Sequence, residues 1–215
     1  MSAEAVRVLA IRHGETAWNV DTRIQGQLDI PLNDNGRWQA QRLARALASR
    51  DPIDTVYTSD LLRAWDTARA VSDAAGVALV LDEGLRERGF GVFEGQTFAE
   101  IEARWPQESQ RWRQRDPHWA PEGGESLSQM RERVLATLAR LAAAHRGEQI
   151  VLVAHGGVMD MLYREATGLG LQAPRTWQLG NAAVNRLLWT PDSLTLVGWS
   201  DTSHLDDDFL EETTA

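Results

Sequence analysis

The stretch VRVLAIRHGETAWN (6–19) joins an apolar run to an arginine, a histidine and a glycine in direct succession. A short run that is almost wholly apolar is typical of a strand buried on both faces of a sheet. Arg12 and His13 then stand where this strand is expected to end. Alone they are compatible with an anion pocket, a nucleophile or a solvated strand end, and the rest of the chain has to separate these alternatives.

Short strand-type runs alternate with longer helix-type segments along the chain. The strand-type runs are VRVLAI (6–11), IDTVYT (53–58), VALVL (77–81), IVLVAH (150–155), AVNRLLW (183–189) and LTLVGW (194–199). The last two flank the turn TPDS and predict a β-hairpin. The alternation predicts an α/β fold: a three-layer sandwich with a mainly parallel central sheet, helices on both faces and an antiparallel edge hairpin.

Helical spacing of apolar residues and capping residues place the helices between these runs. One helix is expected over residues 35–49, and another from Ser126 to about His145. Ser59 and Asp60 are expected to cap a further helix, because serine and aspartate are favoured at that position.

Residues 84–125 interrupt the alternation with a segment rich in glycine, arginine and tryptophan. Thr97, with Glu100 completing a capping box, predicts one short helix inside this segment. Long excursions within α/β domains often cover the active site. We therefore expect a lid over about residues 84–125, within a single domain that spans residues 1–215.

Three arginines in the expected lid admit two interpretations. Arg111 and Arg115 lie four residues apart and share one face if the segment is helical, whereas Arg113 lies on another. They either bind a second anionic group of a ligand or belong to a solvated helix whose Trp112 packs on the core. We favour the second interpretation, because charged residues usually form the solvated face of a helix.

Composition excludes several classes of protein and chemistry. The net charge of −9 argues against a nucleic-acid-binding surface. The chain has no lysine for Schiff-base chemistry and no cysteine for disulfides, thiolate catalysis or cysteine-ligated metal. No apolar run approaches the ~20 residues of a membrane span, and no signal peptide is evident. We expect a cytoplasmic protein without a nucleic-acid or membrane partner.

Residues that follow the strand-type runs carry the chemistry, because open parallel sheets bind ligands beyond the carboxyl ends of their strands. After the four parallel runs, in turn, come Arg12 and His13; Ser59 and Arg63; Glu83, Arg86 and Glu87; and His155, Gly156 and Gly157. Guanidinium forks suit tetrahedral oxyanions, and a helix that begins after His155 adds backbone N–H donors. The set therefore predicts a phosphoryl site at this edge of the sheet.

A histidine in such a site can attack phosphorus and carry the group as phosphohistidine, and a carboxylic acid can protonate the leaving oxygen. No cluster of metal ligands is apparent in the sequence, and arginines can stabilise the transferring group in place of a metal. The other histidines, His118, His145 and His204, are expected to be surface or packing residues.

Blocks of sequence along nearly the whole chain resemble one family in order and spacing. They are RHGETAWN (12–19), RIQGQLDIPLNDNG (23–36), SDLLRAWDTA (59–68), LRERGFGVFEGQ (85–96), GGES (123–126) and VAHGG (153–157). They are similar to the histidine phosphatase superfamily, also called the phosphoglycerate mutase-like family. The tail SHLDDDFLEE resembles its bacterial branch of phosphoglycerate mutase-like phosphatases.

This resemblance implies a role for each residue that matches a family motif. His13 is implied as the nucleophile, and Arg12, Arg63 and His155 as ligands of the phosphoryl oxygens. Glu87 is implied as the proton donor to the leaving group and later as the base for water.

On the substrate side the resemblance implies that Asn19, Gln25 and Gly26 line the pocket and that Gly156 offers a backbone N–H. It implies no metal and no organic cofactor. From the residues alone, Glu83 and Glu15 compete with Glu87 for the role of the acid, and the match of LRE to the family motif favours Glu87.

The block ERGFG (87–91) departs from the ERHYG of the glycolytic mutases, and the excursion that contains it is short. Both departures favour a phosphatase that hydrolyses a small phosphomonoester, such as a phospho-acid or a sugar phosphate. A phosphoglycerate mutase is the alternative, and a non-catalytic phospho-ligand binder is less favoured because His13 and Glu87 are both present. Trp189 and Trp199 of the hairpin either form the interface of a homodimer or belong to the core.

Overall fold

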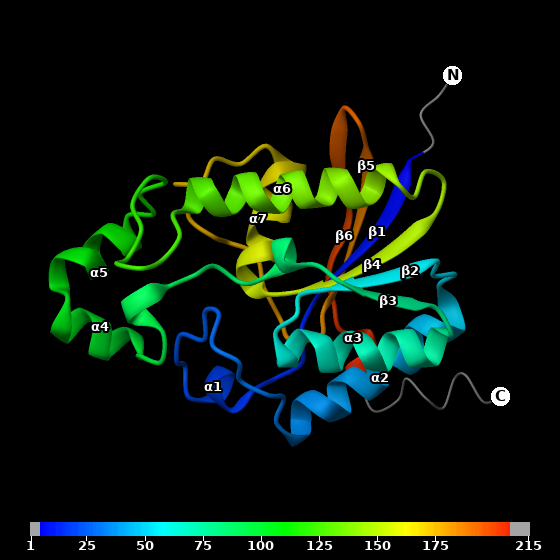
Figure 1. Cartoon of the computed structure of the whole chain (residues 1–215), viewed down its shortest axis with the longest axis horizontal. Helices are drawn as coiled ribbons and strands as arrows, with labels where there is room; N and C mark the ends of the chain where they lie inside the picture. The colour runs from blue at the N-terminus through cyan, green and yellow to red at the C-terminus, as the bar shows by residue number, and fades with distance from the viewer. Residues whose placement is uncertain (1–4, 207–215) are drawn as a thin grey trace.

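The computed structural model describes residues 5–206, and these are built around one six-stranded sheet (Figure 1). The strands are β1 (Val6–Arg12), β2 (Thr55–Thr58), β3 (Ala78–Leu81), β4 (Gln149–Ala154), β5 (Val184–Thr190) and β6 (Ser193–Asp201). Their order is β3-β2-β4-β1-β5-β6; the first four are parallel, and β5 and β6 form the antiparallel hairpin at one edge. The predicted α/β class and mixed sheet are confirmed.

Helices cover both faces of this sheet. They are α1 (Ala17–Val20), α2 (Asp34–Arg50), α3 (Leu62–Ala75), α4 (Phe98–Arg104), α5 (Pro106–Arg113), α6 (Leu127–Ala143) and α7 (Gly156–Thr167). Short 3-10 turns occupy η1 (Glu83–Leu85), η2 (Gly91–Phe93) and η3 (Ser203–Leu205). Helices α6 and α7 lie on one face and α2 and α3 on the other (Figure 1), as the three-layer prediction requires. Within the described residues, no helix is both long and apolar enough to span a bilayer.

The apolar run of β1 is explained by burial on both faces. Val8 and Ala10 pack in the cluster with α6 and α7, whereas Leu9 and Ile11 pack in the cluster with α2 and α3. Alternate side chains of a strand point to opposite faces, so a central strand needs apolar residues throughout. The run ends at Arg12, where the strand reaches the edge of the core.

Leu85 joins the cluster with α6 and α7, but the rest of the segment 84–125 forms an apolar cluster of its own. Phe93, Ile101 and Trp119 are buried together, with Trp105 and Trp112 packed against them. Its helices α4 and α5 stand apart from the sheet (Figure 1). The capping box of Thr97 and Glu100 opens α4 as predicted, but α5 was not expected, since only one helix was predicted here.

The predicted cap of α3 is wrong. Leu61 is the N-cap residue and provides no side-chain bond. The N–H of Leu62 instead donates to the carboxylate of Asp29, at 2.7 Å. Asp60 pairs with Arg86, and Ser59 bonds to a residue after β4, so tertiary contacts use both of the expected caps.

At the C-terminal end, Leu205 lies half-buried in η3. Phe209 and Leu210 lie outside the described residues. Trp189 and Trp199 of the hairpin pack against the cluster of β1, α6 and α7, on the core side.

Candidate active site

A cavity of about 620 Å³ opens beyond the carboxyl ends of the parallel strands. Residues predicted for the site supply much of its lining: Arg12, His13, Asn19, Gln25, Gly26, Arg63, Glu87 and Gly156. His155 lies fully buried beside it, with its ring centroid 5.2 Å from that of His13. The structure thus brings together residues from four separate strand ends.

His13 is buried, and the hydrogen bond of its Nδ1 decides its tautomer. Nδ1 lies 2.7 Å from the carbonyl oxygen of Gly14. A carbonyl can only accept, so Nδ1 carries the proton and Nε2 keeps its lone pair. Burial holds the pKa of His13 well below its usual value, and the charges of Arg12 and Arg63 lower it further. The imidazole is therefore neutral, with Nε2 ready to act as a nucleophile.

His155 is the N-cap residue of α7, and its Nε2 lies 2.9 Å from the hydroxyl of Ser59. Its Nδ1 is buried and has no hydrogen-bond partner. Burial, followed by the charge of Arg63, holds its pKa well below the usual value. A bound anion would reverse this balance, because negative charge favours the protonated ring.

Arg12 and Arg63 are anchored by carbonyl oxygens and keep donors free. Arg63 donates to the carbonyls of Gly26 and Leu28, at 2.7 and 2.8 Å, and Arg12 donates to that of Leu179. The Nε of each guanidinium is buried without a partner. Burial lowers the pKa of Arg63 to about 10, so it stays charged at neutral pH. Two fixed cations with unpartnered donors fit a tetrahedral oxyanion.

Glu87 reaches the cavity from the segment after β3 and is held at the start of α7. The backbone N–H of Gly157 donates to both of its carboxylate oxygens at 3.1 Å, and that of Arg88 donates to Oε1 at 2.7 Å. A Cβ on Gly157 would lie 2.2 Å from Oε1, so a larger residue there would displace the carboxylate. The carbonyl of Glu87 accepts from Gln27 at 3.1 Å.

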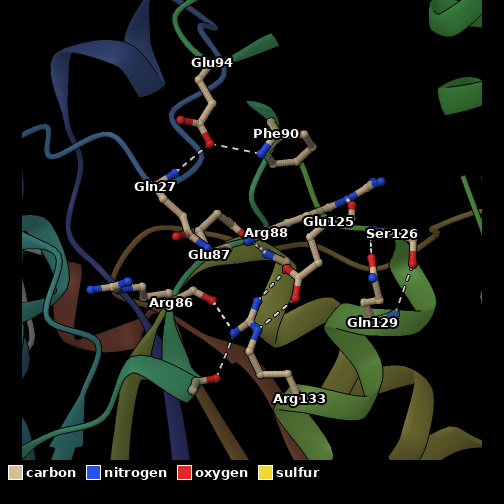
Figure 2. A network of polar contacts seen from close by, with 12 residues as sticks. Gln27, Arg86, Glu87, Arg88, Phe90, Glu94, Glu125, Ser126, Gln129 and Arg133 are labelled. Atoms are coloured by element: carbon tan, nitrogen blue, oxygen red, sulfur yellow. Dashed lines mark hydrogen bonds and ion pairs between the residues drawn. The ribbon is translucent and has the colours of Figure 1, made fainter. Parts of the chain in front are cut away.

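Arg133 of α6 clamps the backbone that leads to Glu87 (Figure 2). Its Nη1 donates to the carbonyls of Gly84 and Arg86, both at 2.9 Å. Its Nε and Nη2 form a two-point pair with the carboxylate of Glu125, at 2.9 and 2.7 Å. Such two-point guanidinium pairs fix orientation as well as position. No motif in the sequence points to these contacts, because two of the partner groups of Arg133 are main-chain carbonyls.

The competing carboxylates lie elsewhere. Glu83 is exposed and forms an ion pair with Arg86, and Glu15 accepts from the side chain of Asn33. Neither lines the cavity, whereas Glu87 does. Of the three acids that the sequence left in competition, Glu87 is the one that lines the cavity.

On the substrate side, Asn19 also has a structural task. Its Oδ1 accepts from the N–H of Thr16 at 3.0 Å in the capping box of α1. Gln25 is buried and bonds to the hydroxyl of Thr16 at 3.0 Å. Gly26 has a φ of +52°, and a Cβ there would collide with Glu94. The three residues line the cavity through loops that these contacts hold.

The lid arginines separate in the structure. Arg111 pairs with Asp116 and Arg113 with Glu102, and neither lines the cavity. Helix α5 ends at Arg113, so Arg115 does not share a helix face with Arg111; it adopts a φ of +52° and lines the cavity. Trp112 packs against the cluster of the segment, as the favoured interpretation expected.

Residues 168–183 also contribute to the site, although sequence reasoning did not predict it. The side-chain amide of Asn181 donates to the carbonyl of His13 at 2.9 Å, and the N–H of Ala182 donates to that of Arg12 at 2.9 Å. The loop has no motif or periodicity, so only its three-dimensional path links it to the site. Across residues 5–206, no group of three or more metal-ligating side chains is placed to hold an ion.

Comparison with known proteins agrees with this geometry. The family profile described as histidine phosphatase superfamily (branch 1) matches residues 8–202. Phosphoglycerate mutase-like protein 4 of Arabidopsis thaliana is 39% identical over 203 residues, which cover 93% of this chain and 87% of that protein. The metal-independent phosphoserine phosphatase of the same plant is 34% identical over 207 residues, covering 95% of this chain and 85% of that protein.

Among solved structures, a mycobacterial glucosyl-3-phosphoglycerate phosphatase complexed with VO3 superposes with a TM-score of 0.81. It is 35% identical in sequence, and the match covers 93% of this chain and 100% of that one. Fold, strand-end site and sequence agree over nearly the whole described chain. The chain belongs to the histidine phosphatase superfamily, branch 1.

Proposed function

We propose that this protein is a phosphatase that hydrolyses small phosphomonoesters through a phosphohistidine on His13. The observation that carries the proposal is the setting of His13: it is buried at the cavity, its Nδ1 lies 2.7 Å from the carbonyl oxygen of Gly14, and Arg12 and Arg63 line the same cavity with unpartnered Nε donors. A neutral imidazole next to fixed cations is what attack on a phosphoryl dianion requires.

In the first step the lone pair of His13 Nε2 forms a bond to phosphorus while the bond from phosphorus to the ester oxygen breaks. Glu87 gives its proton to that oxygen, and the alcohol leaves. Arg12, Arg63 and His155 hold the three phosphoryl oxygens, with Gly156 adding a backbone N–H at the start of α7. Asn19, Gln25 and Gly26 border the leaving group.

In the second step water attacks the phosphohistidine. The Glu87 carboxylate takes a proton from the water as the new oxygen–phosphorus bond forms, and the bond to Nε2 breaks. Inorganic phosphate leaves, and both His13 and Glu87 return to their starting states. The residues proposed here need no metal ion, because arginines neutralise the transferring charge.

A phosphoglycerate mutase remains the second candidate, because the family profile is shared with mutase-like relatives. The block ERGFG, which lacks the histidine and tyrosine of the glycolytic mutases, supports the phosphatase. A non-catalytic binder of phosphorylated ligands is disfavoured by the presence of both His13 and Glu87.

The test is turnover of p-nitrophenyl phosphate in EDTA by the wild type and by His13→Ala. We expect turnover by the wild type alone; turnover that is independent of His13 contradicts the nucleophile, and a metal requirement contradicts the mechanism. Comparing hydrolysis of 3-phosphoglycerate with its isomerisation then separates phosphatase from mutase.

We also propose that the protein acts in the cytoplasm, as one domain, on small molecules rather than on nucleic acids or membranes. The net charge of −9 supports the absence of a nucleic-acid partner. A homodimer remains a prediction of the sequence, which sedimentation of the purified protein tests.

A further inference from the structure

The cavity extends past the phosphoryl-binding residues to a second group of polar side chains. Arg115, Asp160, Arg175 and Trp177 line it and are called the outer subsite here. Asp160 stands one helical turn after Gly156 on α7, which places it about 6 Å further along the same face. The outer subsite therefore adjoins the phosphoryl-binding residues within the same cavity.

Asp160 is buried, and its two carboxylate oxygens differ. Oδ2 accepts from Arg115 at 2.8 Å and from Arg164 at 3.0 Å. Oδ1 is buried and has no hydrogen-bond partner. Leaving a buried charged acceptor unpaired costs free energy, and native proteins rarely do so without reason. Oδ1 can therefore accept a hydrogen bond from an O–H or N–H donor of a ligand.

Positive charge exceeds negative charge around Asp160. Arg115 and Arg164 already pair with it, and Arg175 is exposed at the cavity and forms no ion pair with any residue in 5–206. Burial lowers the pKa of both Arg12 and Arg115, and the charge of Arg175 lowers each further, so Arg175 acts on both ends of the cavity. An uncompensated cation here suits a second anionic group on the substrate.

Trp177 adds a donor to the same subsite. Its ring stacks on Tyr163 with centroids 4.1 Å apart and lies under the guanidinium of Arg164 at 4.8 Å. These contacts fix the ring, yet its Nε1 is buried without a partner. The unpaired acceptor of Asp160, the unpaired donor of Trp177 and the guanidinium of Arg175 thus belong to the lining of one cavity.

We propose that the outer subsite selects phosphomonoesters whose leaving group carries a carboxylate next to an O–H or N–H donor. Arg175, assisted by Trp177, binds the carboxylate, and Asp160 Oδ1 accepts from the donor. Asp160 is a specificity-determining residue of the reaction, which rests on the proposed phosphatase function. A hydroxyl and an ammonium group satisfy the same acceptor, and the substrates of the test distinguish them.

Four esters separate these requirements. O-phosphoserine and 3-phosphoglycerate carry the carboxylate with an ammonium or a hydroxyl donor; 3-phosphonooxypropanoate lacks only the donor, and glycerol 3-phosphate lacks only the carboxylate. We expect kcat/KM for at least one of the first two to exceed that for both of the others by about tenfold, the effect of one buried charged hydrogen bond. Equal kcat/KM across the four esters overturns the proposal.

Asp160→Asn tests the acceptor without dismantling the site. Because two arginines donate to the Oδ2 position, the amide oxygen takes that place, and the NH₂ group replaces Oδ1. The preference for the donor-bearing acid over 3-phosphonooxypropanoate should fall about tenfold. A preference that survives in Asp160→Asn overturns the role of Asp160, whether or not Asp160→Ala folds.

Arg175→Ala should remove the preference for the carboxylate-bearing esters over glycerol 3-phosphate. Arg113→Ala is the matched control, because Arg113 lies in the same segment 84–125 as Arg115 but outside the cavity. This variant should keep the preference for the carboxylate and the preference for the O–H or N–H donor. His13-dependent turnover of p-nitrophenyl phosphate is measured in parallel. If the wild type shows no His13-dependent turnover of p-nitrophenyl phosphate, the proposed function itself is refuted. If it shows this turnover but neither the carboxylate preference nor the donor preference, only the outer subsite is refuted.

Discussion

Gly157 donates its backbone N–H to both carboxylate oxygens of Glu87, each at 3.1 Å. This relationship ties the proposed acid to the first turn of α7, the helix that His155 caps. One helix end thus positions a carboxylate on one side and an imidazole on the other. Partial positive charge at a helix N-terminus favours both a carboxylate and a phosphoryl group.

Gly157→Ala should therefore disable the acid. The new Cβ would lie 2.2 Å from Glu87 Oε1 and 2.7 Å from Met130, so the carboxylate must move away from the cavity. We expect kcat for p-nitrophenyl phosphate to fall about 100-fold, the lower range for loss of a general acid. Gly170→Ala is the matched control, because its Cβ meets open space and kcat should stay at the wild-type value. Equal kcat in the two variants contradicts the positioning of Glu87.

Arg133→Gln should lower kcat without contacting the substrate. It loses the bonds to the carbonyls of Gly84 and Arg86 that hold the segment before Glu87. We expect kcat to fall about tenfold with little change in KM, because misplacement of a reacting group affects the transition state most. Arg140→Gln on the same helix, whose partner is Asp82, should behave as the wild type. A rise in KM alone would assign Arg133 to substrate binding instead.

Arg63→Lys should reduce phosphate affinity although the charge remains. A lysine cannot donate to Gly26 and Leu28 and to an oxyanion at the same time in a fixed plane. We expect kcat/KM to fall about 10- to 100-fold, and the inhibition constant for inorganic phosphate to rise. Arg69→Lys, on the exposed side of α3, is the control that should change neither quantity.

Stability of the free protein should fall in mildly acidic solution. His13 is buried and neutral when folded, with a pKa well below the usual value, whereas in the unfolded chain it gains a proton below about pH 6.5. The unfolded state then binds more protons, so the free energy of unfolding decreases as pH falls. Urea unfolding at pH 7 and pH 5.5 measures this.

Between pH 7 and pH 5.5, the free energy of unfolding of His13→Ala should fall by about 1 kcal/mol less than that of the wild type. His118→Gln, which alters an exposed histidine, should keep the wild-type difference. If His13→Ala loses as much stability as the wild type, the ring is already protonated when folded, and its role as a neutral nucleophile fails.

The sequence predicted the sheet well, because β1 and β4 are buried on both faces and need unbroken apolar runs. It missed α5, whose residues are mostly polar and follow α4 after a single residue. It also misplaced the cap of α3, because Ser59 and Asp60 had partners far along the chain that local propensity does not register.

Strand ends located His13 and His155, since topology alone gathers such residues at one edge. Asp160, Arg175 and the clamp of Arg133 could not be found this way. Asp160 lies within the apolar stretch of α7, Arg175 lies in a loop without pattern, and Arg133 reaches main-chain carbonyls. Their importance depends on which of their polar atoms are hydrogen-bonded and which are left unpaired, and this is decided only in the folded chain.

The separate apolar cluster of residues 84–125 has a consequence for how this architecture diversifies. Phe93, Ile101 and Trp119 of this segment pack against one another, in a cluster separate from the two that hold the sheet. Beyond Glu87, substitutions in this segment can therefore change the rim of the cavity while the strands that carry Arg12 and His13 stay in place. The sheet thus keeps the phosphoryl chemistry constant, whereas the part of the segment after Glu87 is free to change which esters the cavity accepts.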